Sequence, residues 1–366
     1  KVENGYLSYK INKRKLKILA PFSSIKLSKL LFDVTLIKYD ESLKLVKEND
    51  LSASSVNFGA FEPTIESING RQYLVYYEPQ QNEEEEIRLK AAEIDIATLS
   101  IGPSKDLFKI QIDTKVSVNK LMNIITDKKL RIMNSPDKSK TMFLFENGID
   151  NSFSSAVVDK DLKLLWTRAS LIDIPDNIII TSSCVDNAGT VYTGYKIEFK
   201  KGRIEGHVLV TNQSNKEKDI VISEENYMYQ ILVLPSAKQN KINVVGTCFG
   251  ETDYISGVFS ASISTNDFKL SGFKKTDFDE QFINLFNQDG LAYTKKNKFG
   301  LYPSRMRIYE MEDETIGMIG EIKRTKTTSE SHQNISGSYN STSTKTIFSG
   351  SILNVCFKKD NVVFSR

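Results

Sequence analysis

Apolar and polar residues alternate along most of the chain, in runs of four to eight residues. The runs are rich in Val, Ile, Tyr, Phe and Thr, and they end at Asn, Asp, Gly or Lys. A period of two places successive side chains on opposite faces of a β-strand, and the residue types are those that strands favour. The pattern therefore predicts an all-β chain built from many short strands.

Two segments have the spacing of a helix instead. They are Val116–Leu130 and Asp277–Asn287. Ile and Val are frequent in the first, and their branched Cβ atoms lower helix propensity. We expect at most a few helical turns in these two segments and strands nearly everywhere else.

A strand–turn–strand unit recurs along the chain. Each copy has an alternating apolar strand, a turn of two to four residues and a second short apolar element. Asp40, Asp161, Asn266 and Asp360 lie in the turns, where Asp and Asn tolerate the backbone conformation and accept hydrogen bonds from nearby amides. The six copies are Asp33–Val46, Arg88–Ile101, Ser154–Trp166, Tyr229–Asn240, Gly257–Leu270 and Gly350–Phe364.

Another strand precedes most copies, and in several it contains a glycine, namely Gly194, Gly246 or Gly320. Glycine inside a strand marks a bulge or a close backbone approach. Antiparallel hairpins that recur about every 60 residues are typical of a β-propeller. We predict a single propeller-like domain over residues 1–366, with six or seven blades. Two β-sandwiches are the alternative, which the irregular spacing of the copies favours.

Loops of very different length separate the strands. In three of the units they are Gln80–Ile87, Lys200–Asn226, which is long enough to hold an extra hairpin, and Thr325–Thr346. If the repeats are equivalent, these insertions project from one rim, which is where repeat proteins place their binding surfaces.

Composition narrows the setting. The chain has 366 residues, 40% hydrophobic and 26% charged, with a net charge of +3. A packed core is expected, and the near balance of charge predicts no nucleic-acid partner. No apolar run is long enough for a membrane span. The sequence begins at KVENGYLSYK without an initiator Met, which would suit a mature exported chain.

Few side chains suggest catalysis or metal binding. Only two histidines occur, His207 and His332, and both fall in expected loop insertions, which are poor mounts for a catalytic base. The motifs GxSxG, HExxH, GxxxxGK[ST] and GxGxxG are absent. Cys184, Cys248 and Cys356 are far apart and lie in apolar runs, which favours buried thiols, with one disulfide as the alternative.

Several charged clusters have both a functional and a structural interpretation. The acidic run Asn82–Glu86 could bind a cation or a basic partner, but such runs are usually solvated loop tips. The basic Lys10–Lys17 could touch phosphate or anionic lipid, but a solvated hairpin explains it as well. Asp186, Asn187 and Gly189 indicate a turn. We therefore predict no catalytic residue, no metal site and no cofactor.

From Phe143 onward the chain resembles a family of uncharacterised exported proteins of the Bacteroidota. The segments DKDLKLLW, VDNAGTVYTGY, GVFSASIS and ETIGMIGE carry the resemblance, and the N-terminal third matches only in style. Glu312 and Asp313 replace a glycine pair of the family. The resemblance implies a signal peptide, a periplasmic or surface location and a propeller-like fold, but no known activity. The matching residues are Asp161, Leu162, Trp166, Val185, Asp186, Gly189, Val191, Tyr192, Gly246, Gly257, Val258, Phe259, Gly320 and Glu321.

Two functional hypotheses follow. The first is a non-enzymatic exported scaffold whose loop rim contacts a protein complex at the outer membrane or cell surface, with a glycan as another possible ligand. The second is a polysaccharide hydrolase or lyase with carboxylates at the propeller channel. In either case Asp161 is expected to be a turn residue and Trp166 a packing residue between blades.

Overall fold

In the computed structural model, strands account for most of the chain. The first predicted helix falls in residues 112–129, outside the described part, and Leu130 already belongs to a strand. The second is present as α2, Glu280–Asn287. The structure describes residues 2, 5–14, 31–51, 63–79, 86–111, 130–146, 151–172, 177–199, 202–214, 217–223, 228–249, 255–287, 293–295, 298–300, 303–333, 339–358 and 362–365.

The chain divides into two compact units. The first comprises Lys1–Ile174, Val185–Gly189 and Gln213–Asn215, and the rest of the chain forms the second. The single domain over residues 1–366 stays a prediction.

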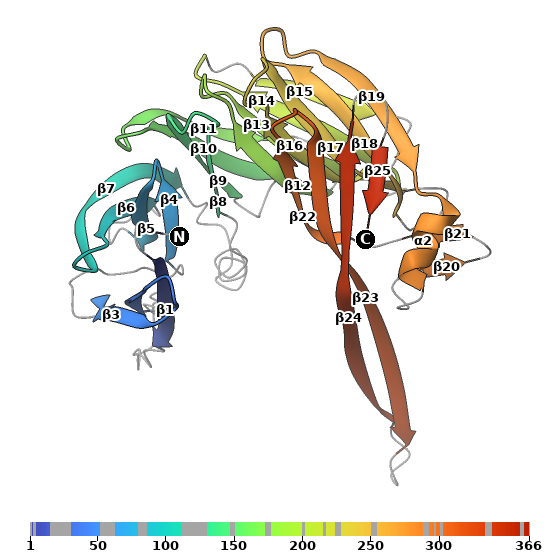
Figure 1. The fold of residues 1–366 in the computed structure, drawn as a ribbon, viewed down its shortest axis with the longest axis horizontal. Coiled ribbons are helices and arrows are strands. Elements are labelled where there is room, and N and C mark those ends of the chain that lie inside the picture. The colour runs from blue at the N-terminus through green and yellow to red at the C-terminus, as the bar shows by residue number, and fades with distance from the viewer. Residues whose placement is uncertain are drawn as a thin grey trace, which may run out of the picture. The chain divides into compact units, whose positions relative to one another are not determined.

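Three sheets lie in the first unit (Figure 1). Their strands are β1 Tyr6–Arg14, β2 Leu31–Tyr39 and β3 Leu45–Asp50; β4 Thr64–Ile68, β5 Arg71–Pro79, β6 Glu86–Asp95 and β7 Ser100–Gln111; and β8 Leu130–Asn134, β9 Lys140–Glu146, β10 Ser152–Asp159 and β11 Leu164–Leu171.

The second unit continues the same plan with three four-stranded sheets and a small hairpin, β20–β21. The strands are β12 Asn177–Val185, β13 Val191–Glu198, β14 Ile204–Thr211 and β15 Glu217–Ser223; β16 Met228–Pro235, β17 Lys241–Phe249, β18 Ile255–Ser264 and β19 Leu270–Asp277; β20 Tyr293–Lys295 and β21 Lys298–Gly300; and β22 Pro303–Glu310, β23 Ile316–Gln333, β24 Tyr339–Phe357 and β25 Val362–Ser365.

Every four-stranded sheet is an up-and-down meander of consecutive strands, and the described pairings between strands are antiparallel. This is the construction of a propeller blade, whereas a β-sandwich distributes successive strands between two sheets through crossover connections. The described part of the chain holds five such sheets and the three-stranded first one. The all-β, propeller-type prediction is confirmed.

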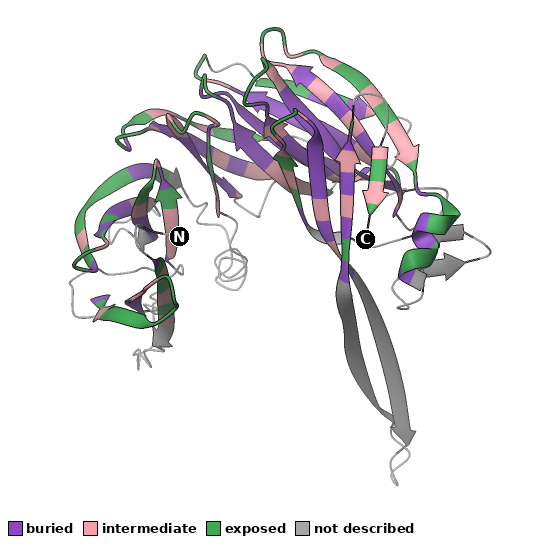
Figure 2. Cartoon of the chain, viewed as in Figure 1, coloured by how far each residue is buried: buried purple, intermediate pink, exposed green. Residues whose placement is uncertain are grey.

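Strand alternation explains how the sheets stack within each unit. On β5, Tyr73 and Val75 pack in a core shared with the third sheet, while Leu74 and Tyr76 pack in a core shared with the first. In the second unit, Ile231 and Leu232 on β16 divide in the same way between the two neighbouring cores. Buried residues therefore run along both faces of the inner strands (Figure 2).

The turns follow the predicted chemistry with one change. Asp40 accepts hydrogen bonds from the amides of Ser42 and Lys44 at 2.8 and 2.9 Å. In the β10–β11 turn this role belongs to Asp159, which accepts from the amides of Asp161 and Lys163. Asp161 lies in the turn as expected, and Asp360 lies outside the described residues.

One of the six predicted repeat copies, Tyr229–Asn240, is wrong. Tyr229–Asn240 comprises most of β16 and the turn after it, so it belongs to the first hairpin of a sheet rather than to the last. The true equivalent is the hairpin β14–β15, which lies in the segment Lys200–Asn226, predicted to be a loop insertion long enough to hold an extra hairpin. His207 is therefore on strand β14 and not in a loop. The other five copies are the last hairpins of their sheets, as predicted.

The third predicted insertion is also a strand pair. β23 and β24 form the longest hairpin described in the chain, and their pairing continues to Gln333 and Tyr339. His332 thus lies on β23. We call the part of this hairpin that extends beyond its sheet, Lys323–Gln333 with Tyr339–Ser349, the arm.

Candidate functional site

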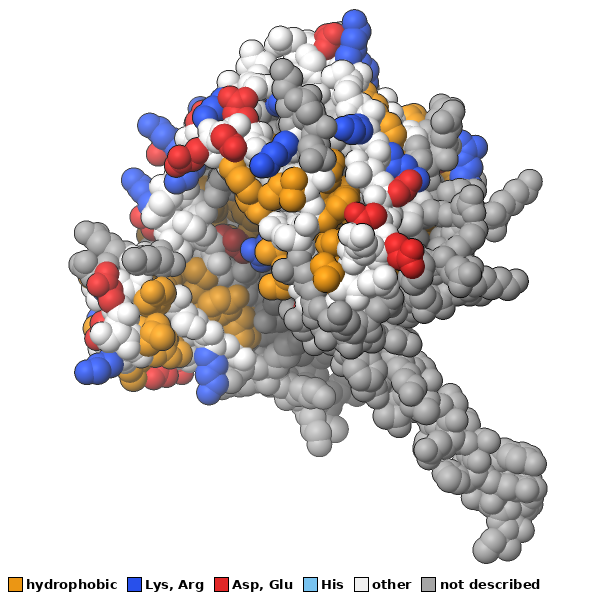
Figure 3. Space-filling model, turned by 45° about the vertical axis from the view of Figure 1, so that its right-hand side comes forward, with side chains coloured by type: hydrophobic (Ala, Val, Ile, Leu, Met, Phe, Trp, Pro, Cys, Tyr) orange, Lys and Arg blue, Asp and Glu red, His pale blue; other side chains and the backbone are white. Residues whose placement is uncertain are grey.

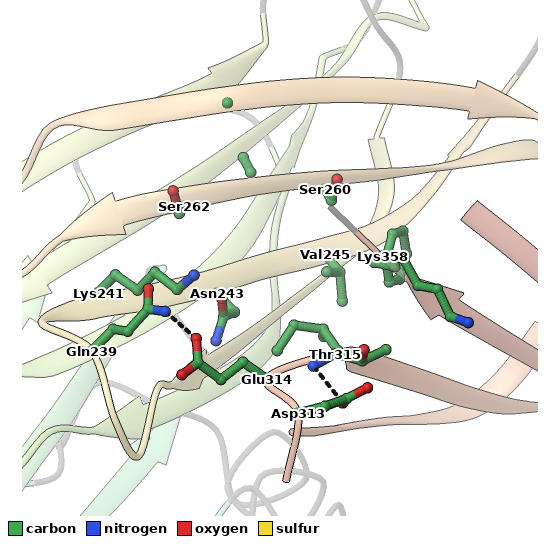
Figure 4. A pocket seen from close by; sticks show the side chains of 14 residues that line it. Gln239, Lys241, Asn243, Val245, Ser260, Ser262, Asp313, Glu314, Thr315 and Lys358 are labelled. Atoms are coloured by element: carbon green, nitrogen blue, oxygen red, sulfur yellow. Dashed lines mark hydrogen bonds between the residues drawn. The ribbon is translucent and has the colours of Figure 1, made fainter. Parts of the chain in front are cut away.

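A cavity of about 570 Å³ opens where the sheet β16–β19 meets the sheet β22–β25, both in the second unit (Figure 4). We call it the rim cavity, because turns at one end of the two sheets surround it. Its lining residues are Gln239, Lys241, Asn243, Val245, Ser260, Ala261, Ser262, Gly272, Asp313, Glu314, Thr315, Ile316, Phe357 and Lys358.

Strand register places one wall of the rim cavity. Lys241, Asn243 and Val245 alternate along β17, so they share a face of the sheet. Asn243 is paired with Ser262 on β18, and Val245 with Ser260, so these serines stand beside them on the same face. The opposite wall comes from the β22–β23 turn and the end of β24.

The β22–β23 turn is held firmly in place. A carboxylate oxygen of Asp313 accepts the Thr315 amide at 3.0 Å, and this hydrogen bond is the main reason that the pKa of Asp313 lies below its ordinary value. Glu314 has a positive φ of 65° and accepts a hydrogen bond from the side-chain amide of Gln239. Both carboxylates at the rim cavity therefore already have partners within the protein.

A second set of hydrogen bonds joins the two sheets beside the rim cavity. Glu310, at the end of β22, accepts from the Ser236 hydroxyl and the Ala237 amide, each at 2.8 Å. Lys238 donates to the carbonyl of Glu312. These bonds fix the β16–β17 turn to the β22–β23 turn, so the two walls are preorganised.

Asn243 is the exception among these bonded groups. Its residue is 5% exposed, and its amide nitrogen Nδ2 has no hydrogen-bond partner. A buried donor without a partner costs about 1–3 kcal/mol relative to one that is satisfied. In Figure 4 the Asn243 side chain points from β17 toward the Asp313–Thr315 turn.

His207 belongs to a different cluster, on the sheet β12–β15. Its Nδ1 lies 2.9 Å from a carboxylate oxygen of Asp219, and its Nε2 lies 3.3 Å from Glu205. Burial by itself lowers the pKa of His207, but the hydrogen bonds and charges of Asp219 and Glu205 outweigh it and raise the pKa. Both ring nitrogens are engaged, so this histidine is not free to accept a proton from a substrate.

Tyr195 completes the cluster. Its ring stacks on His207 with centroids 5.1 Å apart, and its hydroxyl donates to Asp219 at 2.9 Å. Burial first, and then the negative charge of Asp219, raise the pKa of Tyr195. We call these four residues, Tyr195, Glu205, His207 and Asp219, the His207 cluster.

The remaining sequence candidates are structural or lie outside the described residues. Trp166 is on β11, and its indole N–H donates to the carbonyl of Gly189, in the turn before β13, at 3.1 Å. Asp186 and Gly189 close that turn, with an N–O distance of 3.0 Å. The three cysteines are free thiols. The acidic loop is undescribed at residues 80–85, and the basic cluster is described only to Arg14, on β1.

Surface charge is mixed. In the view of Figure 3, Lys and Arg side chains alternate with Asp and Glu over the described surface, and no large patch of one sign is visible there. No helix in the described ranges is both long enough and apolar enough to cross a membrane. Among the same residues, no cluster of three or more His, Cys, Asp or Glu side chains could hold a metal.

Neither a family model nor a curated protein matches this sequence. Among solved structures, it is similar to the β-propeller domain of the Trilobed protease from Pyrococcus furiosus, at 9% identity and TM-score 0.40, over 99% of this chain and 90% of that one. It is similar to an endo-arabinase from Bacteroides thetaiotaomicron at 10% identity and TM-score 0.35, over 71% and 88%.

A third likeness is to prolyl oligopeptidase B from Galerina marginata, at 10% identity and TM-score 0.38, over 87% of this chain and 37% of that one. At these TM-scores the likenesses carry no argument about function. The fold assignment rests on the meander sheets themselves.

Proposed function

We propose that the protein is a non-enzymatic binding protein, an accessory subunit that contacts a protein complex through its arm. The observation that carries this proposal is the arm. β22 pairs with β23 only as far as Ile322, and β25 pairs with β24 only from Asn354 onward. Among the described pairings, the strands of the arm, eleven residues each, therefore pair with each other and with no third strand, over about 35 Å.

A two-stranded ribbon of this kind is marginally stable alone in water. No described strand pairs with either outer edge of the arm, so the backbone N–H and C=O groups along these edges can accept a strand from another protein. The arm sequence, KRTKTTSESHQ and YNSTSTKTIFS, is rich in Ser, Thr and Lys. Polar edges of this composition disfavour indiscriminate aggregation, so we infer a specific partner.

The enzymatic alternative has less support. A glycosidase needs one carboxyl group that stays protonated and can act as a general acid, beside a second carboxylate. In the rim cavity Asp313 and Glu314 are adjacent in one turn and both accept hydrogen bonds, and the pKa of Asp313 is lowered rather than raised. This arrangement favours ligand binding over acid catalysis.

An exported location, in the periplasm or at the cell surface, is part of the proposal and rests on the family resemblance. Fractionation of the source cells, followed by immunodetection, tests it. Recovery with the cytoplasmic fraction would contradict it.

The test of the arm is a deletion that leaves the sheet intact. Lys323 and Ser349 are register partners, so an Asn-Gly turn can replace residues 324–348 between them. Crosslinking in envelopes identifies candidate partners, and interferometry with the purified partner measures affinity. We expect the deletion to weaken binding at least tenfold, while Asn243→Leu, remote from the arm along the chain, leaves it unchanged.

Equal binding by the deletion variant would overturn the role of the arm. Release of sugars from a polysaccharide by the purified wild-type protein would overturn the non-enzymatic assignment.

A further inference from the structure

We propose that the rim cavity binds a neutral saccharide unit. This goes beyond the protein-binding role of the arm and uses different residues. The starting point is Asn243, a residue of the cavity lining whose buried amide nitrogen has no partner within the protein. A ligand that supplies an acceptor oxygen at this position would offset the cost of its burial.

The charges of the cavity indicate what kind of ligand fits. Lys241 and Lys358 contribute two positive charges, and Asp313 and Glu314 contribute two negative ones. A phosphate or another polyanion would meet two carboxylates and no net positive charge. A bare metal cation would meet the two lysines and carboxylates that already accept hydrogen bonds. Net neutrality therefore favours an uncharged polar ligand.

The uncharged lining groups also match a polyhydroxylated ligand. Ser260 and Ser262 contribute hydroxyl groups, and Gln239 and Asn243 contribute side-chain amides. The Ser262 hydroxyl already contacts Ser271 and the Gln239 amide nitrogen donates to Glu314, so both keep acceptor lone pairs for a ligand. Hydroxyls and amides can each donate and accept, as sugar hydroxyls do. The cavity wall thus has hydrogen-bond donors and acceptors that an uncharged ligand can satisfy.

The cavity has an apolar side as well. Val245, Ile316 and Phe357 belong to the hydrophobic core beneath it and also line it. A pyranose ring presents C–H groups on its faces and hydroxyls around its edge, so it can satisfy both kinds of wall. The volume of about 570 Å³ is within the range of small-ligand sites and leaves room for a disaccharide.

The test compares Asn243→Leu with Thr247→Val. Thr247 is two residues beyond Val245 on β17 and is fully buried, and its hydroxyl also lacks a hydrogen-bond partner, but it does not line the cavity. The probes are maltose, cellobiose, lactose and mannobiose, with glucose 6-phosphate as an anionic counterpart and dialanine as a zwitterionic one, which both carry charged groups. Saturation-transfer NMR detects binding, and calorimetry measures the dissociation constant.

We expect at least one neutral disaccharide to bind in the millimolar range or tighter. Asn243→Leu should weaken it tenfold or more, and Thr247→Val should leave it unchanged. The arm deletion should also bind the sugar normally, so failure of the arm proposal is distinguishable from failure of this one. The inference is overturned if no neutral disaccharide binds, if Asn243→Leu binds as well as wild type, or if only a charged probe binds.

Discussion

His207 and Asn243 are two buried polar residues of the second unit that differ in whether their side-chain nitrogens have hydrogen-bond partners. Both are 5% exposed, and each lies on an inner strand of its sheet. The ring nitrogens of His207 face Asp219 and Glu205, whereas the amide nitrogen of Asn243 faces no acceptor. Because buried polar groups are normally satisfied, the hydrogen bonds of His207 are complete within the protein, whereas the amide donor of Asn243 lacks an acceptor there.

Neighbouring residues explain the difference. Tyr195 is the register partner of His207 and stacks on its ring, and Asp219 on the next strand is long enough to reach Nδ1. Asn243 instead has Ser262 across the strand pair, and the hydroxyl of Ser262 lies 3.1 Å from that of Ser271. Ser262 is short and its hydroxyl already contacts Ser271, so it does not accept a hydrogen bond from the Asn243 amide.

The largest effect on stability is expected from His207→Ala. The substitution removes two hydrogen bonds to carboxylates and the stack on Tyr195, and it leaves Glu205, which is largely buried, without that partner. We expect a loss of about 3 kcal/mol in the free energy of unfolding. Urea unfolding measures it, and hydrogen exchange should locate the loosening in β13–β15. Sugar binding by the folded variant should be unaffected.

A change of pH is expected to have a smaller effect on stability, through the titration of His207. The pKa of His207 is raised in the folded protein, so its contribution to stability is fully present below the unfolded-state value of about 6.5 and is lost as pH rises through the folded-state value. Each unit of elevation corresponds to about 1.4 kcal/mol. Unfolding measured from pH 6 to pH 9 should show the decline, and His207→Gln should abolish that part of it. An identical decline in both proteins would place the titrating group elsewhere.

Strand alternation and turn chemistry predict the blade architecture because both are local. Asp40 and Asp159 fix their turns through amides two and four residues away. The sequence does not reveal the hairpin β14–β15, because the segment NQSNK between its two strands lacks the Asp-x-x-Leu order found at Asp40 and Asp159. Without that hairpin the sequence places His207 in a loop.

The rim cavity could not be predicted in the same way. It joins Asn243 to the turn at Asp313–Thr315, some seventy residues later, and only the packing of two sheets brings them together. One local signal was present. In the strand KINVVGTCF, Asn243 occupies a position on the same face as Val245, which is buried in the core. A polar residue at such a position predicts either an internal partner or a ligand.

The smallest expected effect is that of Asn243→Leu on stability, and it distinguishes an internal partner of Asn243 from a ligand. Asn243→Leu replaces an unpartnered buried donor by an apolar side chain of similar size, so we expect the free energy of unfolding to stay constant or to rise by about 1 kcal/mol. Thr247→Val, the same kind of change away from the cavity, should behave alike in stability while preserving sugar binding. Urea midpoints of both variants measure this. If Asn243→Leu instead lost about 2 kcal/mol or more, the amide would have a partner inside the protein, and the contrast with His207 would fail.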